Sequence, residues 1–204
     1  MEAAQVAISV VLAYLLGSTP TAYIVGRRVK GVDLRVAGSG NVGAMNTFKQ
    51  VGIRSGVFVL AADVSKGVLA VFIPVWLGAP SWAMYVTAGA VVAGHNWPLF
   101  LGFRGGRGVA TVAGISLAVL PLLTLIVIGP TILVFVFTRN IVLTVAFGLI
   151  LLNALTAATG QSAGQITLCL ALSLVVTATH YFNVRRPMVE ALRRGNWKAV
   201  LSID

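Results

Sequence analysis

The sequence contains very few acidic residues. Only five of its 204 residues are Asp or Glu, whereas fifteen are Lys or Arg, and the formal net charge is +10. No acid occurs between Val64 and Val189. Charged residues make up 10% of the chain, compared with about 25% in soluble proteins. This balance excludes a soluble globular domain and indicates that the polar parts of the protein are cationic and meet anionic partners.

Cysteine is also scarce. Cys169 is the single cysteine and lies in an apolar run, which excludes an intramolecular disulfide and a cysteine-based metal cluster. No metal, no cofactor and no nucleic-acid partner is expected. Hydrophobic residues, in contrast, make up 58% of the chain, and the mean hydropathy is +0.95. These values exclude a disordered chain and predict an integral membrane protein.

Apolar runs mark the expected membrane spans, each of which needs about 20 residues. The first run, residues 4–25, is interrupted by Gly17, Ser18 and Pro20. The later runs cover residues 56–77, 82–94, 109–138, 140–159 and 161–182. No repeat, low-complexity tract or linker divides the chain, so residues 1–204 are expected to form a single polytopic membrane domain.

The cationic residues sort into four polar segments, and only Lys66 lies inside an apolar run. The segments are residues 26–55, residues 96–108, Arg139 and the tail from residue 183. By the positive-inside rule all four are cytoplasmic, which requires the long run 109–138 to cross twice by turning near Pro121. The prediction is an all-α integral membrane protein, a single bundle of seven transmembrane helices with an outside amino terminus, a cytoplasmic carboxy terminus and glycine-rich cytoplasmic loops. Five spans plus a re-entrant hairpin is an alternative with the same loop positions.

The first polar loop contains three glycines, Gly38, Gly40 and Gly43, at the spacing of a dinucleotide-binding fingerprint. That fingerprint needs a preceding strand, which a chain of membrane spans does not offer. Glycine nevertheless lets the backbone approach an anion closely, and consecutive N–H groups can bind it. Polar and charged side chains accompany the glycines at Arg35, Ser39, Asn41, Asn46 and Lys49. The alternative is that the glycines form turns and the cations bind anionic lipid.

The second polar loop repeats this combination. Gly105, Gly106 and Gly108 alternate with arginines and lead into an apolar run, where a helix amino terminus can bind phosphate. His95 begins the loop. At the end of the last run, the chain places His180 and Asn183 three residues apart, on one helix face. Together these motifs predict an enclosed site for two anionic groups or for one large one.

These motifs together resemble the PlsY family, the bacterial acyl-phosphate-dependent glycerol-3-phosphate acyltransferases of phospholipid synthesis. The likeness covers nearly the whole chain, through residues 15–18, 33–35, 38–44, 63–67, 94–98, 105–111 and 180–186. It implies a multi-pass enzyme of the bacterial plasma membrane with a cytoplasmic active site. The implied reaction transfers a fatty acyl group from acyl phosphate to the 1-hydroxyl of glycerol 3-phosphate and yields lysophosphatidic acid and phosphate. Anionic membrane lipids are a further expected partner.

The resemblance also implies roles for individual residues. Ser39, His180 and Asn183 are the expected catalytic residues, of which the last two orient or activate the acceptor. His95 has either a structural or a proton-handling role. Asp63 and Lys66 are expected to form a supporting ion pair, because either charge alone is costly in lipid. The expected phosphate- and substrate-binding residues are Arg35, Gly38, Gly40, Asn41, Gly43, Asn46, Lys49, His95, Gly105, Gly106, Arg107 and Gly108.

Four positions depart from the family pattern. Met45, Lys49, Arg107 and Val142 stand where the family usually has Thr, Arg, Lys and Ser. The last three of these family residues are associated with the acceptor phosphate, and Arg and Lys are not interchangeable at a bidentate phosphate site. One explanation is a paired exchange that conserves the charge of the pocket. The others are a relative that acylates another acceptor and, from a different class, a non-catalytic anionic-lipid-binding protein or small transporter.

Overall fold

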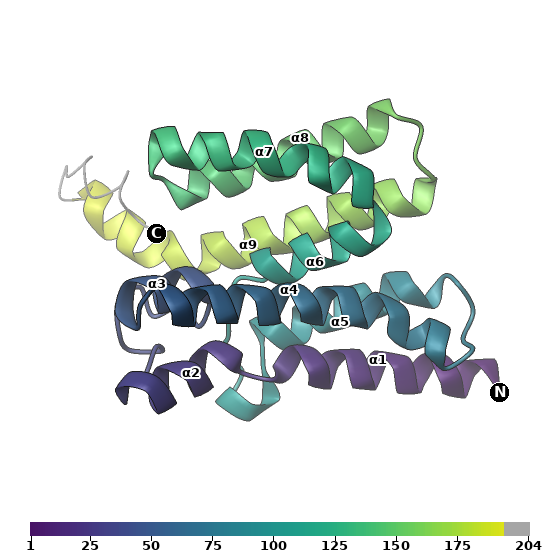
Figure 1. Ribbon diagram of the computed structural model, residues 1–204, viewed down its shortest axis with the longest axis horizontal. Coiled ribbons are helices and arrows are strands. Elements are labelled where there is room, and N and C mark those ends of the chain that lie inside the picture. The colour runs from purple at the N-terminus through teal and green to yellow at the C-terminus, as the bar shows by residue number, and fades with distance from the viewer. Residues whose placement is uncertain (194–204) are drawn as a thin grey trace. The chain divides into compact units, whose positions relative to one another are not determined.

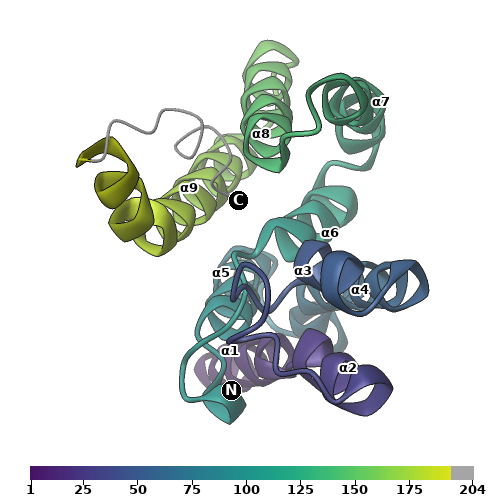
Figure 2. The same cartoon turned by 90° about the vertical axis from the view of Figure 1, so that its left-hand side faces the viewer.

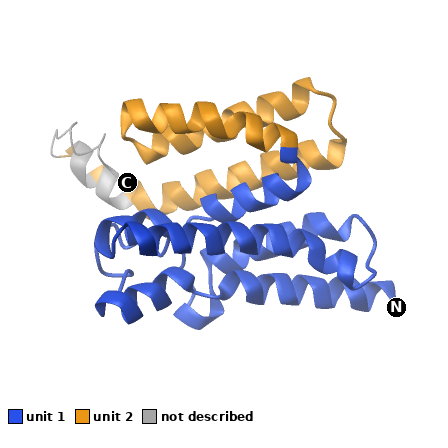
Figure 3. Cartoon of the chain, in the orientation of Figure 1, with its two compact units in different colours: residues 1–121 blue, residues 122–204 orange. Residues whose placement is uncertain are grey.

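The computed structural model describes residues 1–193 (Figure 1). The expected basic tail from residue 194 onward lies outside the described residues, as do the side chains of residues 186–188 and 190–192. Within residues 1–193 the regular elements are helices, without a strand, which confirms the all-α prediction. The chain forms two compact units, Met1–Pro121 and Leu122–Asp204 (Figure 3). Each is described by itself, and the expectation of a single domain stays a prediction.

The first unit carries both glycine-rich loops. Helix α1 packs against α5, and α4 packs against both α5 and α6. Helices α2 and α3 lie at one end of the unit, on the left in Figure 1 and nearest to the viewer in Figure 2. The elements of the unit are α1 (Glu2–Ser18), α2 (Thr21–Lys30), α3 (Ala44–Gln50), α4 (Ile53–Trp76), α5 (Ala83–Asn96), the 3-10 helix η1 (Leu99–Leu101) and α6 (Val109–Val119).

The first apolar run is broken between α1 and α2, as its glycine and proline predict. Thr19 is extended, with φ −62° and ψ 113°, and Pro20 directly precedes α2. Proline has no N–H group and disfavours the helical conformation in the residue before it. The helix therefore stops, and the Thr19 carbonyl oxygen accepts a hydrogen bond from Lys66 Nζ of α4 at 2.7 Å.

Glycines set the distance between α1 and α5. A Cβ atom on Gly17 would collide with the carbonyl oxygen of Val91, and a Cβ atom on Gly94 would collide with the carbonyl oxygen of Tyr14. Each helix thus supplies one glycine to a contact between two backbones. Small residues are the usual means by which membrane helices approach closely.

A second pair of glycines joins α4 and α6 in the same way. A Cβ atom on Gly67 would collide with the carbonyl oxygen of Thr111, and one on Gly114 with the carbonyl oxygen of Val64. The core of the first unit is therefore fixed by two backbone contacts, in which α1 meets α5 and α4 meets α6.

The segment after α2 is organised around one carboxylate. Asp33 accepts hydrogen bonds from Arg35 Nε at 3.0 Å, from Arg35 Nη2 at 2.8 Å and from Arg27 Nη2 at 3.2 Å. Both guanidinium groups lie over the Tyr23 ring, 4.9 and 5.6 Å from its centre. The hydrogen bonds from the Arg35 side chain are the main cause that lowers the pKa of Asp33 to about 2. The same contact raises the pKa of Arg35.

The second unit contains α7 (Pro121–Thr138), α8 (Ile141–Ala158) and α9 (Ala163–Arg193). The uncharged run 109–138 is divided at Leu120, next to the predicted turn at Pro121, and its two helices have 11 and 18 residues rather than about 14 each. Asn140 caps α8, because its side chain accepts hydrogen bonds from the amides of Val142 and Leu143. Helices α8 and α9 are joined by a 2.7 Å hydrogen bond from Asn153 Nδ2 to Ser173 Oγ.

Five segments of the described chain are long and apolar enough to cross a membrane, which confirms a multi-pass protein. Helices α5 and α6, with 14 and 11 residues, extend only about 21 and 16 Å at about 1.5 Å per residue. The seven-span count and the orientation therefore stay predictions. The five segments are Glu2–Lys30, Ile53–Trp76, Pro121–Thr138, Ile141–Ala158 and Ala163–Arg185, the first of which includes the break at Pro20.

The substitution Gly94→Ala tests the contact between α1 and α5. The added methyl group has to displace the Tyr14 carbonyl, so we expect the variant to lose about 1–3 kcal/mol of stability, as overpacked sites do. The measurement is the thermal unfolding midpoint in detergent. Gly89→Ala, on the same helix, is the matched control because a Cβ atom there meets open space. Equal midpoints for the two variants would contradict the contact.

The pKa of Asp33 predicts a dependence of stability on pH. Because this pKa is about 2 in the folded protein, below its ordinary value of 3.8, the ionised carboxylate stabilises the fold above about pH 4, and this stabilisation is lost as the pH falls through about 2. The Asp33→Asn variant lacks this stabilisation at every pH. We expect the wild type to unfold at a higher temperature than the variant near pH 6, with the difference shrinking toward pH 2. A difference that does not change with pH would count against this ion pair.

Candidate functional site

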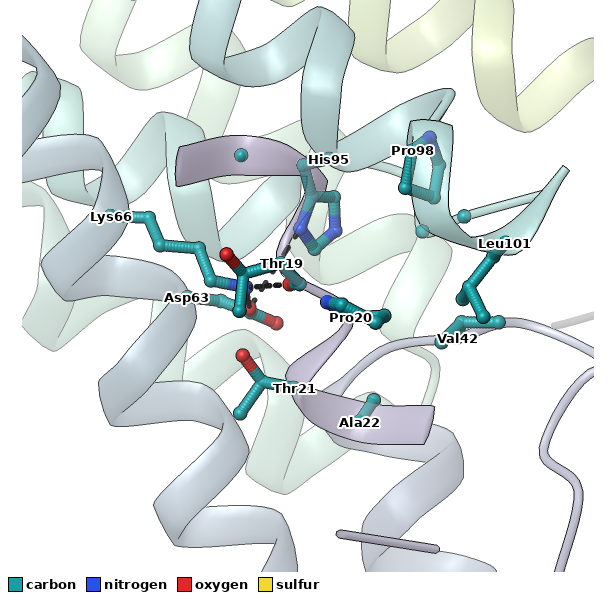
Figure 4. A pocket seen from close by; sticks show the side chains of 13 residues that line it. Thr19, Pro20, Thr21, Ala22, Val42, Asp63, Lys66, His95, Pro98 and Leu101 are labelled. Carbon is teal, nitrogen blue, oxygen red and sulfur yellow. Dashed lines mark hydrogen bonds and ion pairs between the residues drawn. The ribbon is translucent and has the colours of Figure 1, made fainter. Parts of the chain in front are cut away.

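A small pocket lies within the first unit (Figure 4). The pocket is lined by the break between α1 and α2, by α4, by the end of α5 and by the second glycine-rich loop. Val42 of the first glycine-rich loop also lines it. The pocket thus brings segments together that are far apart in the sequence. Five of the residues predicted for the site line it, namely Asp63, Lys66, His95, Gly105 and Gly106.

A buried charged group occupies one wall of this pocket. Lys66 Nζ lies 2.7 Å from Asp63 Oδ1, so the expected ion pair is present, and both side chains are less than a tenth exposed. The ring nitrogen Nδ1 of His95 lies 3.8 Å from the same carboxylate oxygen. The carboxylate therefore stands between an ammonium group and an imidazole ring. Within residues 1–193, no three His, Cys, Asp or Glu side chains gather as ligands of a metal ion.

The second glycine-rich loop folds directly onto the end of α5. The amide of Gly106 donates to the His95 carbonyl oxygen at 3.0 Å, and the amide of Gly105 donates to the Asn96 carbonyl oxygen at 3.2 Å. A Cβ atom on Gly106 would collide with Nε2 of the His95 ring. These two glycines are thus required by close packing, and their amides bind carbonyl oxygens of the chain rather than turning toward an anion. Gly108, with φ +79°, directly precedes α6.

Asn46 organises the first glycine-rich loop. Its Nδ2 atom donates to the carbonyl oxygens of Leu34, Ala37 and Asn41 at 3.0–3.2 Å, and its Oδ1 atom accepts from the Ser39 amide at 3.3 Å. The side chain is buried. Asn46 is predicted to contact the substrate, whereas its side-chain amide, on α3, binds the backbone of the loop that precedes this helix. It therefore fixes the shape of the segment that presents Ser39.

The other predicted residues of the first loop fall into two groups. Arg35 is bound to Asp33, and the left-handed glycines shape the turn, since Gly38 has φ +59° and Gly40 has φ +71°. The Ser39 and Lys49 side chains are exposed, and Asn41 is partly buried. Ser39 and Lys49 thus have the most accessible side chains of this group, and those of Asn41 and Arg35 are partly accessible. Gly43 directly precedes α3.

The remaining predicted residues lie elsewhere in the structure. Arg107 is partly buried in the second glycine-rich loop of the first unit. His180 and Asn183 lie on α9 of the second unit, where His180 is partly buried and Asn183 is exposed. Val142 lies in the first turn of α8. The pocket described above includes neither His180 nor Asn183.

Several lining residues were not predicted from the sequence. The main ones are Thr19, Pro20 and Thr21 at the break, with Pro98 and Leu101 at the second glycine-rich loop. The signal that could have identified Thr19 is the combination of a proline inside one apolar run and a lysine inside the next. The proline interrupts the helical hydrogen bonding near it, and a buried lysine needs acceptors.

Comparisons with known proteins agree over nearly the whole chain. The family model described as glycerol-3-phosphate acyltransferase matches residues 7–190. The glycerol-3-phosphate acyltransferase of Clostridioides difficile is 41% identical over 191 residues, which cover 91% of this chain and 93% of that protein. That of Thermoanaerobacter sp. strain X514 is 37% identical over 179 residues, covering 88% and 90%.

Solved structures give the same result. The crystal structure of PlsY, an integral membrane glycerol 3-phosphate acyltransferase, in its glycerol 3-phosphate form superposes with a TM-score of 0.81 at 32% identity. The match covers 94% of this chain and 93% of that one. The lysophosphatidic acid form of PlsY gives a TM-score of 0.80 at 31% identity. The chain therefore belongs to the glycerol-3-phosphate acyltransferase family, and it is a multi-pass membrane enzyme that acylates glycerol 3-phosphate in phospholipid synthesis.

Proposed function

We propose that the acyl donor is an acyl phosphate and that the reaction takes place at the pocket around Lys66, His95 and Gly106. Residues predicted for the site line this one pocket, although they come from a loop, from the end of a helix and from an apolar run. This convergence supports the location. Acyl phosphate is a mixed anhydride with a good leaving group. The 1-hydroxyl oxygen attacks the acyl carbon, the bond from this carbon to the phosphate oxygen breaks, and the hydroxyl proton leaves with a base or with the phosphate. Such a reaction chiefly requires orientation and charge stabilisation.

We further propose that the chain crosses the membrane seven times, with its amino terminus outside and its active site on the cytoplasmic side. The division of residues 109–138 at Leu120 supports this, because two crossings there bring every cationic loop to one side. The short helices α5 and α6 are compatible with crossing, since local thinning of the bilayer costs only a fraction of a kcal/mol per Å.

The first glycine-rich loop is proposed to contact phosphate through Ser39 and Asn41. Support comes from their position on a loop whose backbone Asn46 holds in place. Lys49 and Arg35 provide positive charge beside this loop, and Gly38, Gly40 and Gly43 allow its turns. In this proposal Asn46 acts by fixing the loop and not by touching the substrate.

The second glycine-rich loop is proposed to bind the donor through the segment around Gly108, where α6 begins, and Arg107 is proposed to contact the acceptor phosphate. His95 holds this loop through Gly106, which favours a structural role over proton handling for that ring. His180 and Asn183 are proposed to orient or activate the acceptor. Their support is the match of the H-x-x-N spacing to the family motif.

Anionic membrane lipids are proposed as a further partner of α2. The exposed residues of this helix combine the cations Arg28 and Lys30 with the apolar side chains Ile24 and Val29. Cations next to apolar side chains suit the boundary between phospholipid headgroups and acyl chains.

Ser39→Ala tests the proposed phosphate contact. We expect turnover to fall by about 100-fold or more, the effect of removing one donor from a developing negative charge, while the unfolding midpoint stays unchanged because Ser39 is exposed. Phosphate release from palmitoyl phosphate with glycerol 3-phosphate is the measurement, made on the purified protein in detergent. Ser65→Ala is the control, since that hydroxyl bonds to the Ala61 carbonyl oxygen of its own helix. Normal turnover in Ser39→Ala would contradict the assignment.

The paired exchange of cations at Lys49 and Arg107 can be tested by restoring the family residues. Lys49→Arg and Arg107→Lys are each expected to raise KM for glycerol 3-phosphate by about tenfold, or about 1.4 kcal/mol, because each disturbs the geometry of one phosphate contact. The double variant is expected to return to within about threefold of the wild type, since residues in one network do not act additively. Additive losses in the double variant would show that the two positions act independently.

A further inference from the structure

Lys66 joins the break in the first apolar run to the buried carboxylate of α4. Its Nζ atom donates to the Thr19 carbonyl oxygen and to Asp63 Oδ1, at 2.7 Å in both cases. The Lys66 side chain is 7% exposed. The ammonium group is therefore held at a fixed point, with the broken helix on one side and α4 on the other.

The same carboxylate leads to the second glycine-rich loop. Asp63 Oδ1 lies 3.8 Å from Nδ1 of His95, and the opposite ring nitrogen, Nε2, occupies the place where a Cβ atom of Gly106 would be. The His95 carbonyl oxygen also accepts the Gly106 amide at 3.0 Å. Contacts thus continue along the pocket from Thr19 through Lys66, Asp63 and His95 to Gly106. Figure 4 shows the side chains of the first four close together.

The energetic cost of these features argues against a purely stabilising role. Removing two charges from water is energetically costly, and apolar replacements of buried ion pairs are often neutral or stabilising. A proline that interrupts a helix also destabilises it, because a backbone hydrogen bond is lost. The chain places both costly features, the pair Asp63–Lys66 and the break at Pro20, at the same pocket.

We infer that Lys66 is a positioning residue for acyl transfer. It fixes the Thr19 carbonyl at the break and, through Asp63 and His95, holds the turn at Gly106 on the opposite side of the pocket. The inference rests on the proposed location of the reaction in this pocket. A displacement of about 1 Å can cost about 100-fold in rate, so loss of Lys66 should lower kcat much more than it raises KM.

Two variants separate positioning from charge burial. Lys66→Met leaves Asp63 buried without its counterion, so it should lose both stability and activity. Asp63→Asn/Lys66→Met removes both charges, so its unfolding midpoint should return close to that of the wild type, while kcat stays about 100-fold lower and KM changes less than threefold. If the double variant regains both its midpoint and its kcat, the pair is merely structural and the inference is overturned.

A third variant leaves the buried charges intact. Pro20→Ala restores an N–H group at the break and favours a continuous helix, which moves the Thr19 carbonyl away from Lys66. We expect an equal or higher unfolding midpoint and a kcat lower by about tenfold. Pro130→Ala is the matched control, because Pro130 lies inside α7 and outside the pocket. An unchanged kcat in Pro20→Ala overturns the inference even where the charge variants fail to fold.

The assay distinguishes failure of the inference from failure of the proposed donor. Formation of lysophosphatidic acid from labelled glycerol 3-phosphate is followed for all variants, with palmitoyl phosphate in one arm and palmitoyl-CoA in the other. A wild type that is active only with the thioester shows that the proposed donor is wrong, and the variants are then compared with that substrate. Wild-type kcat in the double variant and in Pro20→Ala, with whichever donor works, refutes the positioning role alone.

Discussion

The hydrogen bond from Lys66 to the Thr19 carbonyl is the interaction on which the architecture of the pocket depends. A helix inside a membrane has no water to satisfy its backbone, so a break is tolerated only where other groups of the protein bind the freed atoms. Pro20 creates such a break, Lys66 supplies a side-chain donor beside the Thr21 amide, and Asp63 supplies the charge that allows a lysine to be buried there. Pro20, Lys66 and Asp63 are each unusual in an apolar run, and the presence of each is explained by the other two.

The structure also shows what two of the few acidic residues do. Asp33 binds the guanidinium groups of Arg35 and Arg27, and Asp63 binds Lys66. Both carboxylates therefore hold cations in defined places. The surplus of positive charge suits an enzyme whose acceptor and product both carry phosphate.

Much of the helix pattern could be predicted from the sequence, because proline and charge act locally. The break before Pro20, the division of the run at Pro121 and the pair Asp63–Lys66 all follow from residue types at known spacings. The role of Asn46 could not be predicted, since an amide that binds a ligand and one that binds its own loop look the same in a sequence. The Thr19 carbonyl is a backbone atom that every residue has, so only the folded chain identifies it. Gly105 and Gly106 were equally ambiguous, because glycine permits both an anion contact and close packing against a ring.

Glycine also explains how an apolar bundle places the polar residues of its pocket accurately. Gly94 directly precedes His95, and Gly67 directly follows Lys66. Each of these glycines forms a backbone contact with a neighbouring helix that does not tolerate even a methyl group. The histidine and the lysine are therefore each anchored one residue away from a close backbone contact between helices. Functional groups on rigid elements are held more accurately than those on loops, so the packing that sets the helix distances also sets the geometry of the buried charged group.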